Sequence, residues 1–318
     1  MKVNVKRIYS LKGTLYYLTK RNFKNFFKDT KKLFFTILTP FIFLIFFGLF
    51  LGKITENNFE TSFSNLSQIP TLFKKLEWKQ VHTFTISFLL MGLLSVTAVS
   101  NAVSLSSVMV SDRQNDLLND FFISPVKSSL VKFSYIFFNI IVNVLLSWLV
   151  MLTIVFYVLV RGLLFKELFI AYLKIFFLTI INCAVHSVIF VFIFSFVKNN
   201  GVYNALASIL GTFIGVFVGA YFPINQFPKW LQAIVSLIPA TQMNAIFRNE
   251  VYPVLLKEFY SNDIMSKIPQ WFEEFIDLKA ILFTKRVEWY YSLTYIVSFG
   301  IIFATLSAAI KLNLQRRK

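Results

Sequence analysis

A run of polar side chains from Asp112 to Lys132 separates two long uncharged stretches of the chain. Its carboxylates recur every four residues, at Asp112, Asp116 and Asp120. One helix would place them on one face and the apolar Leu117, Leu118, Phe121 and Phe122 on the other. Pro125 disfavours the helical conformation at Ser124, so this helix should end there. The run over 112–130 predicts either a short amphipathic element on which a basic partner docks or, equally, a solvated loop whose acids only cap helices.

A second group of polar side chains lies inside the uncharged stretches. Amide and hydroxyl groups recur at helical spacing, at Thr97, Asn101, Ser104, Asn139 and Asn143. Such groups can line a polar path through a membrane, and they can also hydrogen-bond neighbouring helices. The second interpretation is favoured for any single residue, and we keep the five as candidates for a pathway.

The residues that carry catalysis or ion coupling are missing from these stretches. They contain no Asp, Glu, Lys or Arg, and His186 is the one histidine among them. This argues against a proton-coupled or cation-coupled carrier, which usually needs buried carboxylates. Gly48 to Ile54 includes Gly-Lys but lacks the spacing and the hydroxyl of a phosphate-binding loop. We expect no catalytic residue, metal or cofactor in this chain, and the single Cys183 excludes an intramolecular disulfide.

The elements that position these residues must be membrane-spanning helices. The chain has 318 residues, 57% of them hydrophobic, with 40 Phe and only 15% charged residues. This composition is typical of an all-α polytopic membrane protein, which we treat as one domain over 1–318. Six stretches are long enough to cross a bilayer, at about 33–52, 83–108, 133–160, 175–197, 202–222 and 289–310.

Basic residues indicate the orientation of the six spans. Residues before Leu33 include ten Lys or Arg and one acid, Asp29. An excess of this kind marks the cytoplasmic side, so both termini should be cytoplasmic in the cell membrane, which we expect to be bacterial. Residues 1–32 alternate between apolar and basic faces and predict an amphipathic helix on the inner leaflet. The net charge of +17 then reflects topology and anionic lipids, not nucleic acid.

Small residues and an external segment complete the pattern. Gly48 and Gly52 are four apart, and Gly211, Gly215 and Gly219 follow Ala207 at the same spacing, which favours close helix packing within the chain or with a second copy. The segment 223–288 should be an external loop. Its apolar positions from Trp230 to Ile238 predict a short re-entrant or interfacial helix that ends at Pro239, followed by a polar surface stretch from Arg248 to Glu288.

The chain resembles the transmembrane subunits of type-2 ABC exporters. Their coupling helix between spans two and three follows an acidic-Arg start and ends in two apolar residues and Ser-Pro, a pattern matched by Asp112, Arg113, Leu118, Phe121, Phe122, Ile123, Ser124 and Pro125. Gln114, Asp116, Leu117 and Asn119 depart from the family pattern. After the fifth span the family has an external helical hairpin, which Pro228, Pro239, Thr241 and Arg248 resemble.

The resemblance implies a permease subunit that acts with other chains. It implies two cytoplasmic ATPases, which hold ATP and Mg²⁺, and a second permease subunit that is either identical or different. It also implies that Asp112, Arg113, Asp116, Leu117, Asp120, Phe121, Ser124 and Pro125 couple the ATPase to transport. Two alternatives stay open: an ion-coupled secondary transporter, and a membrane immunity or scaffold protein that transports nothing.

Overall fold

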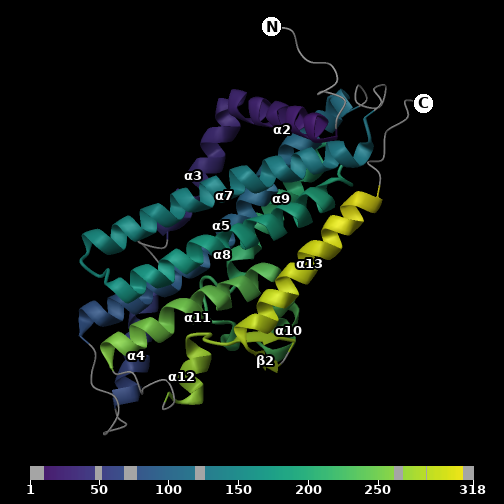
Figure 1. Ribbon diagram of the computed structural model, residues 1–318. Coiled ribbons are helices and arrows are strands. Elements are labelled where there is room, and N and C mark those ends of the chain that lie inside the picture. Colours follow the sequence, from purple (N-terminus) through teal and green to yellow (C-terminus); the bar gives the residue numbers. More distant parts are fainter. Residues whose placement is uncertain are drawn as a thin grey trace.

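A computed structural model describes residues 11–46, 52–67, 77–118, 126–260, 268–283 and 285–310, which form a helical bundle (Figure 1). The longer helices are α2 (Leu11–Lys28), α3 (Thr30–Phe46), α4 (Gly52–Ser67), α5 (Trp78–Gln114), α7 (Ser128–Val160), α8 (Lys166–Phe194), α9 (Asn200–Phe217), α11 (Pro239–Phe259) and α13 (Trp289–Ala309). Shorter elements are η2 (Ile224–Gln226), α10 (Lys229–Ser236), α12 (Gln270–Phe275) and the antiparallel strands β1 (Ala280–Leu282) and β2 (Lys285–Val287).

Five of the described helices are long and apolar enough to cross a membrane: α5, α7, α8, α9 and α13. They coincide with the last five of the six predicted spans: α5 and α7 contain their whole predicted ranges, whereas α8, α9 and α13 end before the predicted ends at 197, 222 and 310. The first predicted span, 33–52, coincides in part with α3, which covers 17 residues, and residues 47–51 lie outside the described part. This first span, and with it the total of six, therefore stays a prediction.

Helix α5 forms the centre of the bundle. It packs against α7, α8, α9 and α11, and α7 and α8 run beside it (Figure 1). Nearly all its residues from Val81 to Val110 are buried, because small side chains on several faces let neighbouring helices approach closely. The outer faces of α7 and α8 instead expose large apolar side chains such as Leu152, Phe156 and Phe177, as expected for surfaces in contact with lipid.

Helix α11 is the main departure from the predicted fold. Pro239 was expected to end a helix, but it opens α11, and the short helix before it is α10. Helix α11 packs against α5, α8 and α13, with its residues from Pro239 to Arg248 buried. The prediction of a polar surface stretch from Arg248 onward is therefore wrong for the part that forms α11.

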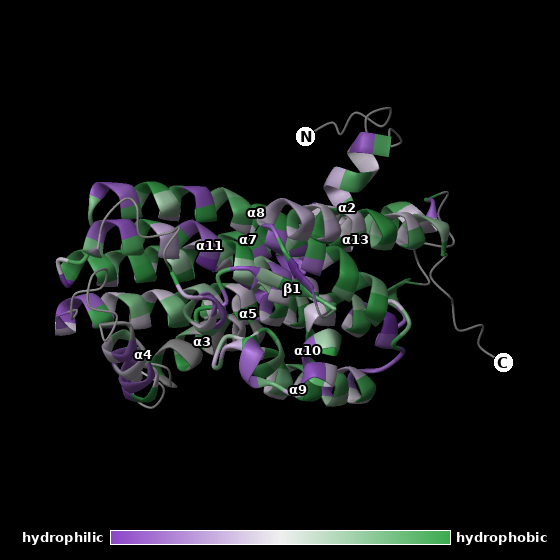
Figure 2. Cartoon of the chain, turned by 90° about the horizontal axis from the view of Figure 1, so that it is seen from below, coloured by the Kyte–Doolittle hydropathy of each residue, from purple (hydrophilic) through white to green (hydrophobic). Residues whose placement is uncertain are grey.

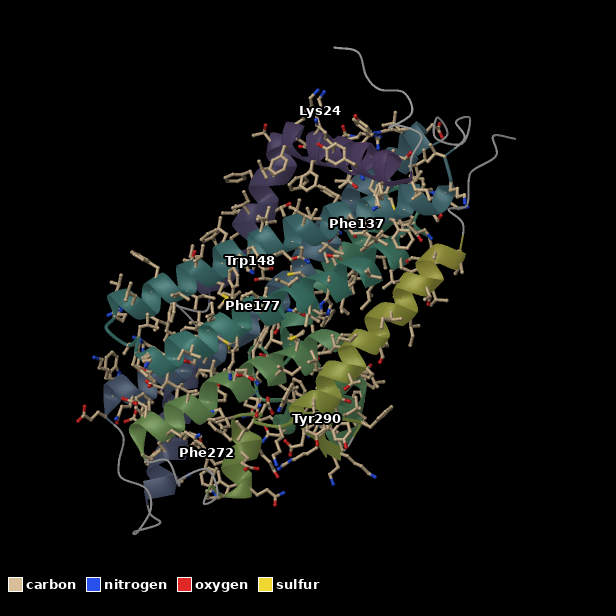
Figure 3. All side chains as sticks on the ribbon, viewed as in Figure 1. Lys24, Phe137, Trp148, Phe177, Phe272 and Tyr290 are labelled. Atoms are coloured by element: carbon tan, nitrogen blue, oxygen red, sulfur yellow. The ribbon has the colours of Figure 1, made fainter. Side chains whose placement is uncertain are left out.

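The two ends of the bundle differ in the elements they present. Helix α2 lies against α7 at one end, and its residue Lys24 points away from the bundle (Figure 3). The opposite end contains α12 with Phe272 and the start of α13 with Tyr290 (Figure 3). Coloured by hydropathy, the helices are mostly hydrophobic along their lengths, whereas α4 and several helix ends are hydrophilic (Figure 2). We call the end that contains α2 the junction.

Candidate functional site

The junction is built around the carboxylate of Asp112, which is the first acid of the polar run. Asp112 is buried near the end of α5. Its Oδ2 accepts hydrogen bonds from Arg21 Nη1 on α2 at 2.8 Å and from Tyr135 OH on α7 at 2.5 Å. Burial by itself lowers the pKa of Arg21, but the facing Tyr135 and Asp112 outweigh it, so this pKa is raised and the guanidinium stays charged. One carboxylate thus joins three helices.

Apolar contacts hold α2 in the same place. Phe26 is buried, and its ring and that of Phe23 both pack on Phe138 of α7 at centroid distances of 5.6 and 5.3 Å. Asn22 Nδ2 donates to Ser134 Oγ at 3.1 Å. Of the amphipathic helix predicted over 1–32, the part from Leu11 to Lys28 is present as α2, and its Phe23 and Phe26 side chains pack on α7.

Two residues that follow Asp112 link α5 to the next pair of helices. Arg113 Nη1 donates to the carbonyl oxygens of Ser195 at 2.5 Å and Val197 at 3.2 Å, which lie just after α8. Gln114 Oε1 accepts from the backbone N–H of Asn200, the first residue of α9, at 2.7 Å. These bonds satisfy backbone groups that the ends of helices leave without intrahelical partners. The end of α5 is consequently fastened to α8 and α9.

The junction also includes the last described residues of the chain. Lys132 on α7 is buried, and its Nζ donates to the carbonyl oxygen of Ile310, directly after α13, at 2.7 Å. Segments that are far apart in sequence, α2 and the end of α13, therefore meet the same helix. This is the arrangement expected when both ends of a chain lie on one side of a membrane.

The prediction of one continuous helix through Asp112, Asp116 and Asp120 is wrong, because the helix ends between the first two of these residues. Helix α5 ends at Gln114, and Asp116 has φ 58°, in the left-handed region that breaks a right-handed helix. Asp112 therefore belongs to the long α5 and points to α2, whereas Asp116 lies in a turn. Asp and Asn adopt this conformation more readily than most residues because their short side chains bond locally, a local preference that the four-residue spacing conceals.

The rest of the predicted coupling segment is described in part. Leu117 is 40% exposed, whereas Leu118 is buried, so at this point one of the two leucines is available to a partner. Residues Asp120, Phe121, Ser124 and Pro125 lie outside the described residues. Their coupling role stays a prediction from the sequence.

Most of the candidate pathway residues lie between helices. Asn139 Nδ2 donates to the carbonyl oxygen of Ala102 at 2.9 Å, and Asn143 Nδ2 donates to that of Ala98 at 2.8 Å, so both α7 residues bond α5. Thr97 and Asn101 on α5 are also buried. Asn139 and Asn143 therefore bond a neighbouring helix, whereas Thr97 Oγ1 and Asn101 Nδ2 are buried without a hydrogen-bond partner among the described residues, so a pathway role for these side chains stays a prediction.

Ser104 differs from the other four because it faces an open groove. The groove, of about 640 Å³, lies between α5 and α9. Its polar lining consists of Ser100, Ser104, Tyr203, Asn204, Ser208 and Thr212. Ser104 Oγ also lies 2.9 Å from Thr36 Oγ1 of α3. Hydroxyl and amide groups along one wall suit a hydrated or polar surface and not contact with lipid tails.

The predicted glycine stripe has three different local roles. At Gly211 a β-carbon would meet no atom within 4 Å, so no described part of this chain packs against this residue. At Gly215 a β-carbon would collide with the Tyr221 ring. Gly219 lies beyond the end of α9 with φ 71°, where it forms a turn, so its assignment to a helical stripe is wrong. Gly52 begins α4, and Gly48 lies outside the described residues.

The structure contains a buried ion pair at the other end of the bundle that the sequence pattern did not predict. Arg248 on α11 is fully buried, and its Nη1 lies 2.8 Å from Asp277 Oδ2. Its Nη2 donates to the carbonyl oxygen of Gly219 at 2.6 Å, and the guanidinium carbon lies 3.8 Å from the Phe88 ring centroid. Burial raises the pKa of Asp277, while Arg248 and the backbone N–H of Ile224 oppose the shift. This pair fixes the turn after α9 to α11.

Taken together, the long apolar helices, the buried polar contacts and an amphipathic helix tied to their ends define a polytopic membrane protein with a groove along its spans. The comparison with protein families gives a more specific class. The family model described as ABC-2 type transporter matches residues 14–252. The chain belongs to this family of transporter membrane proteins. No curated protein sequence matches the chain.

Proposed function

We propose that the chain is the permease subunit of an ABC exporter and that a separate cytoplasmic ATPase docks on the segment 112–125. The observation that supports this most directly is the junction. There the polar run begins at a point bonded to α2, α7, α8 and α9 through Asp112, Arg113 and Gln114. The family match over residues 14–252 supports the same class of subunit. ATP and Mg²⁺ would be held by the partner ATPase.

The junction offers a physical route from a docked ATPase to the spans. Helix α5 is 37 residues long, and a helix of that length moves as a rod when its end is displaced. A push on the turn at Asp116 would act on α5 directly, on α8 through Arg113 and on α9 through Gln114. Helices α5 and α9 form the two walls of the groove, so their relative movement would change its width.

The groove is the part of the chain that best fits a translocation pathway. It is open on one side, and its wall combines Ser104, Asn204, Ser208 and Thr212 with apolar residues of α5 and α9. A second permease subunit, either a copy of this chain or a different one, would close it. Cargo would then pass between the two subunits, and the mixed lining favours an amphipathic cargo over a small ion.

Orientation follows from the distribution of basic residues. Helix α2 contains five Lys or Arg and no acid, and it lies at the junction. Under the positive-inside tendency the junction faces the cytoplasm, where an ATPase is available. In this orientation α4, α10 and α12 lie on the outer side of the cell membrane. The outward direction of transport rests on the resemblance to type-2 ABC exporters.

The decisive experiment first looks for an ABC ATPase in the neighbouring reading frames and then tests co-purification of that ATPase with variants of the segment. Burial of Phe121 in a cleft of the partner would contribute about 1.5 to 3 kcal/mol, so Phe121→Ala should lower binding by roughly tenfold or more. Asp116→Asn retains a residue that tolerates the left-handed turn, and the loss of one exposed ion pair costs about 0.2 to 1 kcal/mol. It should therefore have a smaller effect.

The control is Lys53→Gln, which changes an exposed charge on α4 and should leave binding unchanged. ATP hydrolysis by the reconstituted complex, measured in vesicles, gives a second readout. If Phe121→Ala and the double variant Asp116→Asn with Asp120→Asn both bind the ATPase at wild-type levels, the segment is a loop without a coupling role. Transport that continues without ATP but ends when an ion gradient is abolished would favour a secondary transporter.

A further inference from the structure

A cleft separate from the groove lies between α4, α5 and α7, at the end of the bundle opposite the junction. Its volume is about 360 Å³. The deeper wall is apolar and comes from Ile86, Leu89, Leu90, Leu93 and Ile154. The helices α4, the start of α5 and the end of α7 that form it lie together at one side of the molecule (Figure 1).

The mouth of this cleft is cationic. Lys53 and Arg161 both line it, and neither forms an ion pair with another described residue. Lys79 Nζ lies 3.9 Å from the position that a β-carbon on Gly162 would take, so a third cation lies close to the backbone of the residue that follows Arg161. Both Lys53 and Arg161 are exposed, so their charges are accessible to a ligand.

Among the described residues that line the cleft, the one acid is engaged within the protein. Glu56 Oε1 lies 3.3 Å from His82 Nδ1, and His82 Nε2 lies 3.3 Å from Tyr157 OH. The Trp78 ring stacks on His82 at a centroid distance of 4.8 Å. The guanidinium carbon of Arg161 lies 5.5 Å from the Tyr157 ring centroid, which orients this cation at the edge of the cleft. These contacts form a rigid polar rim above an apolar wall.

We propose that this cleft binds an anionic membrane phospholipid, with an acyl chain against the apolar wall and the phosphate between Lys53 and Arg161. Four features select this occupant. The cleft opens beside the large apolar side chains Leu152 and Phe156 of α7, which are exposed as a lipid-facing surface is. Its wall suits a hydrocarbon chain, and its unpaired cations suit a phosphate. Helix ends with Trp78 and Tyr157 are typical of the headgroup layer.

Charge complementarity distinguishes this proposal from ordinary contact with bulk lipid. A zwitterionic lipid fits the apolar wall equally well but gains little from two uncompensated cations. Each Lys or Arg near an anionic lipid surface contributes about fivefold to binding. Binding should therefore depend on headgroup charge and on both cations, whereas lipid that merely surrounds the protein would show neither dependence.

The test is native mass spectrometry of the full-length chain extracted from vesicles of equal phosphatidylglycerol and phosphatidylcholine. The wild-type protein should retain phosphatidylglycerol in preference to phosphatidylcholine. The double variant Lys53→Gln with Arg161→Gln should weaken this binding by roughly tenfold or more. The matched control is Lys166→Gln with Lys257→Gln, which removes two other exposed cations that do not line the cleft and should preserve binding.

A second variant tests the apolar wall without changing charge. Ile86 is partly exposed in the cleft, and Ile86→Trp would fill the volume that an acyl chain needs. It should displace bound phosphatidylglycerol while the purified chain keeps its melting temperature. Equal retention of the two lipids, or loss of lipid to the same extent in the control pair, would contradict the proposal. Phosphatidylglycerol binding that survives both the charge variant and Ile86→Trp would also contradict the proposal.

Discussion

At the scale of single residues, two buried acids, Asp112 and Asp277, each link separate helices through hydrogen bonds and ion pairs. Asp112 joins α5 to Arg21 of α2 and Tyr135 of α7, and Asp277 joins the end of α12 to Arg248 of α11. Both carboxylates have a cationic partner, because an isolated buried charge would be too costly to retain. Removing one partner leaves the other charge uncompensated, so each pair makes a measurable prediction.

The first prediction concerns Asp112→Asn. The substitution retains the shape of the side chain but leaves the partly buried Arg21 without its carboxylate, so we expect a loss of about 1 to 3 kcal/mol in stability. It should also loosen α2 from the bundle. The measurements are the thermal unfolding midpoint in detergent and the protease sensitivity of α2. Asp116→Asn is the control, and an equal midpoint for Asp112→Asn and wild type would contradict the role assigned to Asp112.

The second prediction compares a buried ion pair with an exposed one. Arg248–Asp277 is buried, with side-chain exposures of 0% and 6%, whereas Lys279–Glu288 is exposed at 40% and 49%. Asp277→Asn should destabilise the protein by about 3 to 5 kcal/mol because it strands a buried guanidinium. Lys279→Gln should cost less than about 1 kcal/mol. Both are measured as folded protein recovered after heating, and similar losses would refute the distinction.

At the scale of elements, the apolar helices were predictable and α11 was not. Long uncharged stretches located α5, α7, α8, α9 and α13, because spans in lipid must be apolar and internally hydrogen-bonded. Helix α11 contains Gln242, Asn244 and Arg248, which made it look like a surface segment. In the structure these side chains donate to the carbonyl oxygens of Ser236, Val218 and Gly219, groups set free by the turns around it. Such pairing depends on tertiary contacts that periodicity does not encode.

The same limit applies to the coupling segment. Spacing placed Asp112 and Asp116 on one helical face, but spacing does not report that Asp116 adopts φ 58° and ends the helix. Asp112 was assigned to an exposed face because nothing near it in the sequence indicates a partner; its partner Arg21 lies 91 residues away. The polar run begins where the ends of several helices meet, but neither this meeting point nor the direction of each side chain could be read from the spacing.

The third prediction concerns two glycines in different helices. A β-carbon on Gly92 of α5 would lie 2.6 Å from Ala220 Cα, whereas one on Gly211 of α9 would meet nothing within 4 Å. Gly92→Ala should therefore force the turn after α9 away from α5 and cost about 1 to 3 kcal/mol. Gly211→Ala should leave the isolated chain as stable or raise its stability by up to about 1 kcal/mol. Thermal unfolding in detergent distinguishes them, and destabilisation of equal size would contradict this packing.

At the scale of the whole molecule, the junction and the opposite end should lie on different sides of the membrane. In a Cys183→Ser background, cysteines at Lys318 and Asn262 report these two sides. We expect an impermeant external reagent to label Asn262→Cys in intact cells and to label Lys318→Cys only after the membrane is opened. Labelling of both in intact cells would overturn the arrangement with both termini inside.

The surface of α9 sets a condition on the assembled transporter. Among its residues only Tyr203, Ile214 and Gly215 are buried, and its exposed side chains include Asn204, Ser208 and Thr212. Polar groups of this kind are unfavourable against lipid tails. The exposed side chains of α13, such as Ile301, Ile302 and Leu306, are apolar by contrast and suit lipid directly. We therefore expect the α9 face to be covered by a second permease subunit and by the aqueous path between them.

The last prediction tests that contact by cysteine crosslinking in membranes. In the Cys183→Ser background, single cysteines replace Asn204, Ser208, Gly211 or Thr212, which are exposed on α9 and line the groove. At least one should form a disulfide or a short bifunctional crosslink between subunits, because helices that pack in a membrane approach within about 8 to 10 Å. Leu152→Cys on the lipid-facing α7 is the matched control and should stay monomeric. The mass of the crosslinked product shows whether the second subunit is another copy of this chain or a different chain. A different chain needs an equivalent cysteine to form the crosslink. Crosslinking through α7 but at none of the four α9 positions would place the subunit contact elsewhere and leave the α9 groove without a second wall.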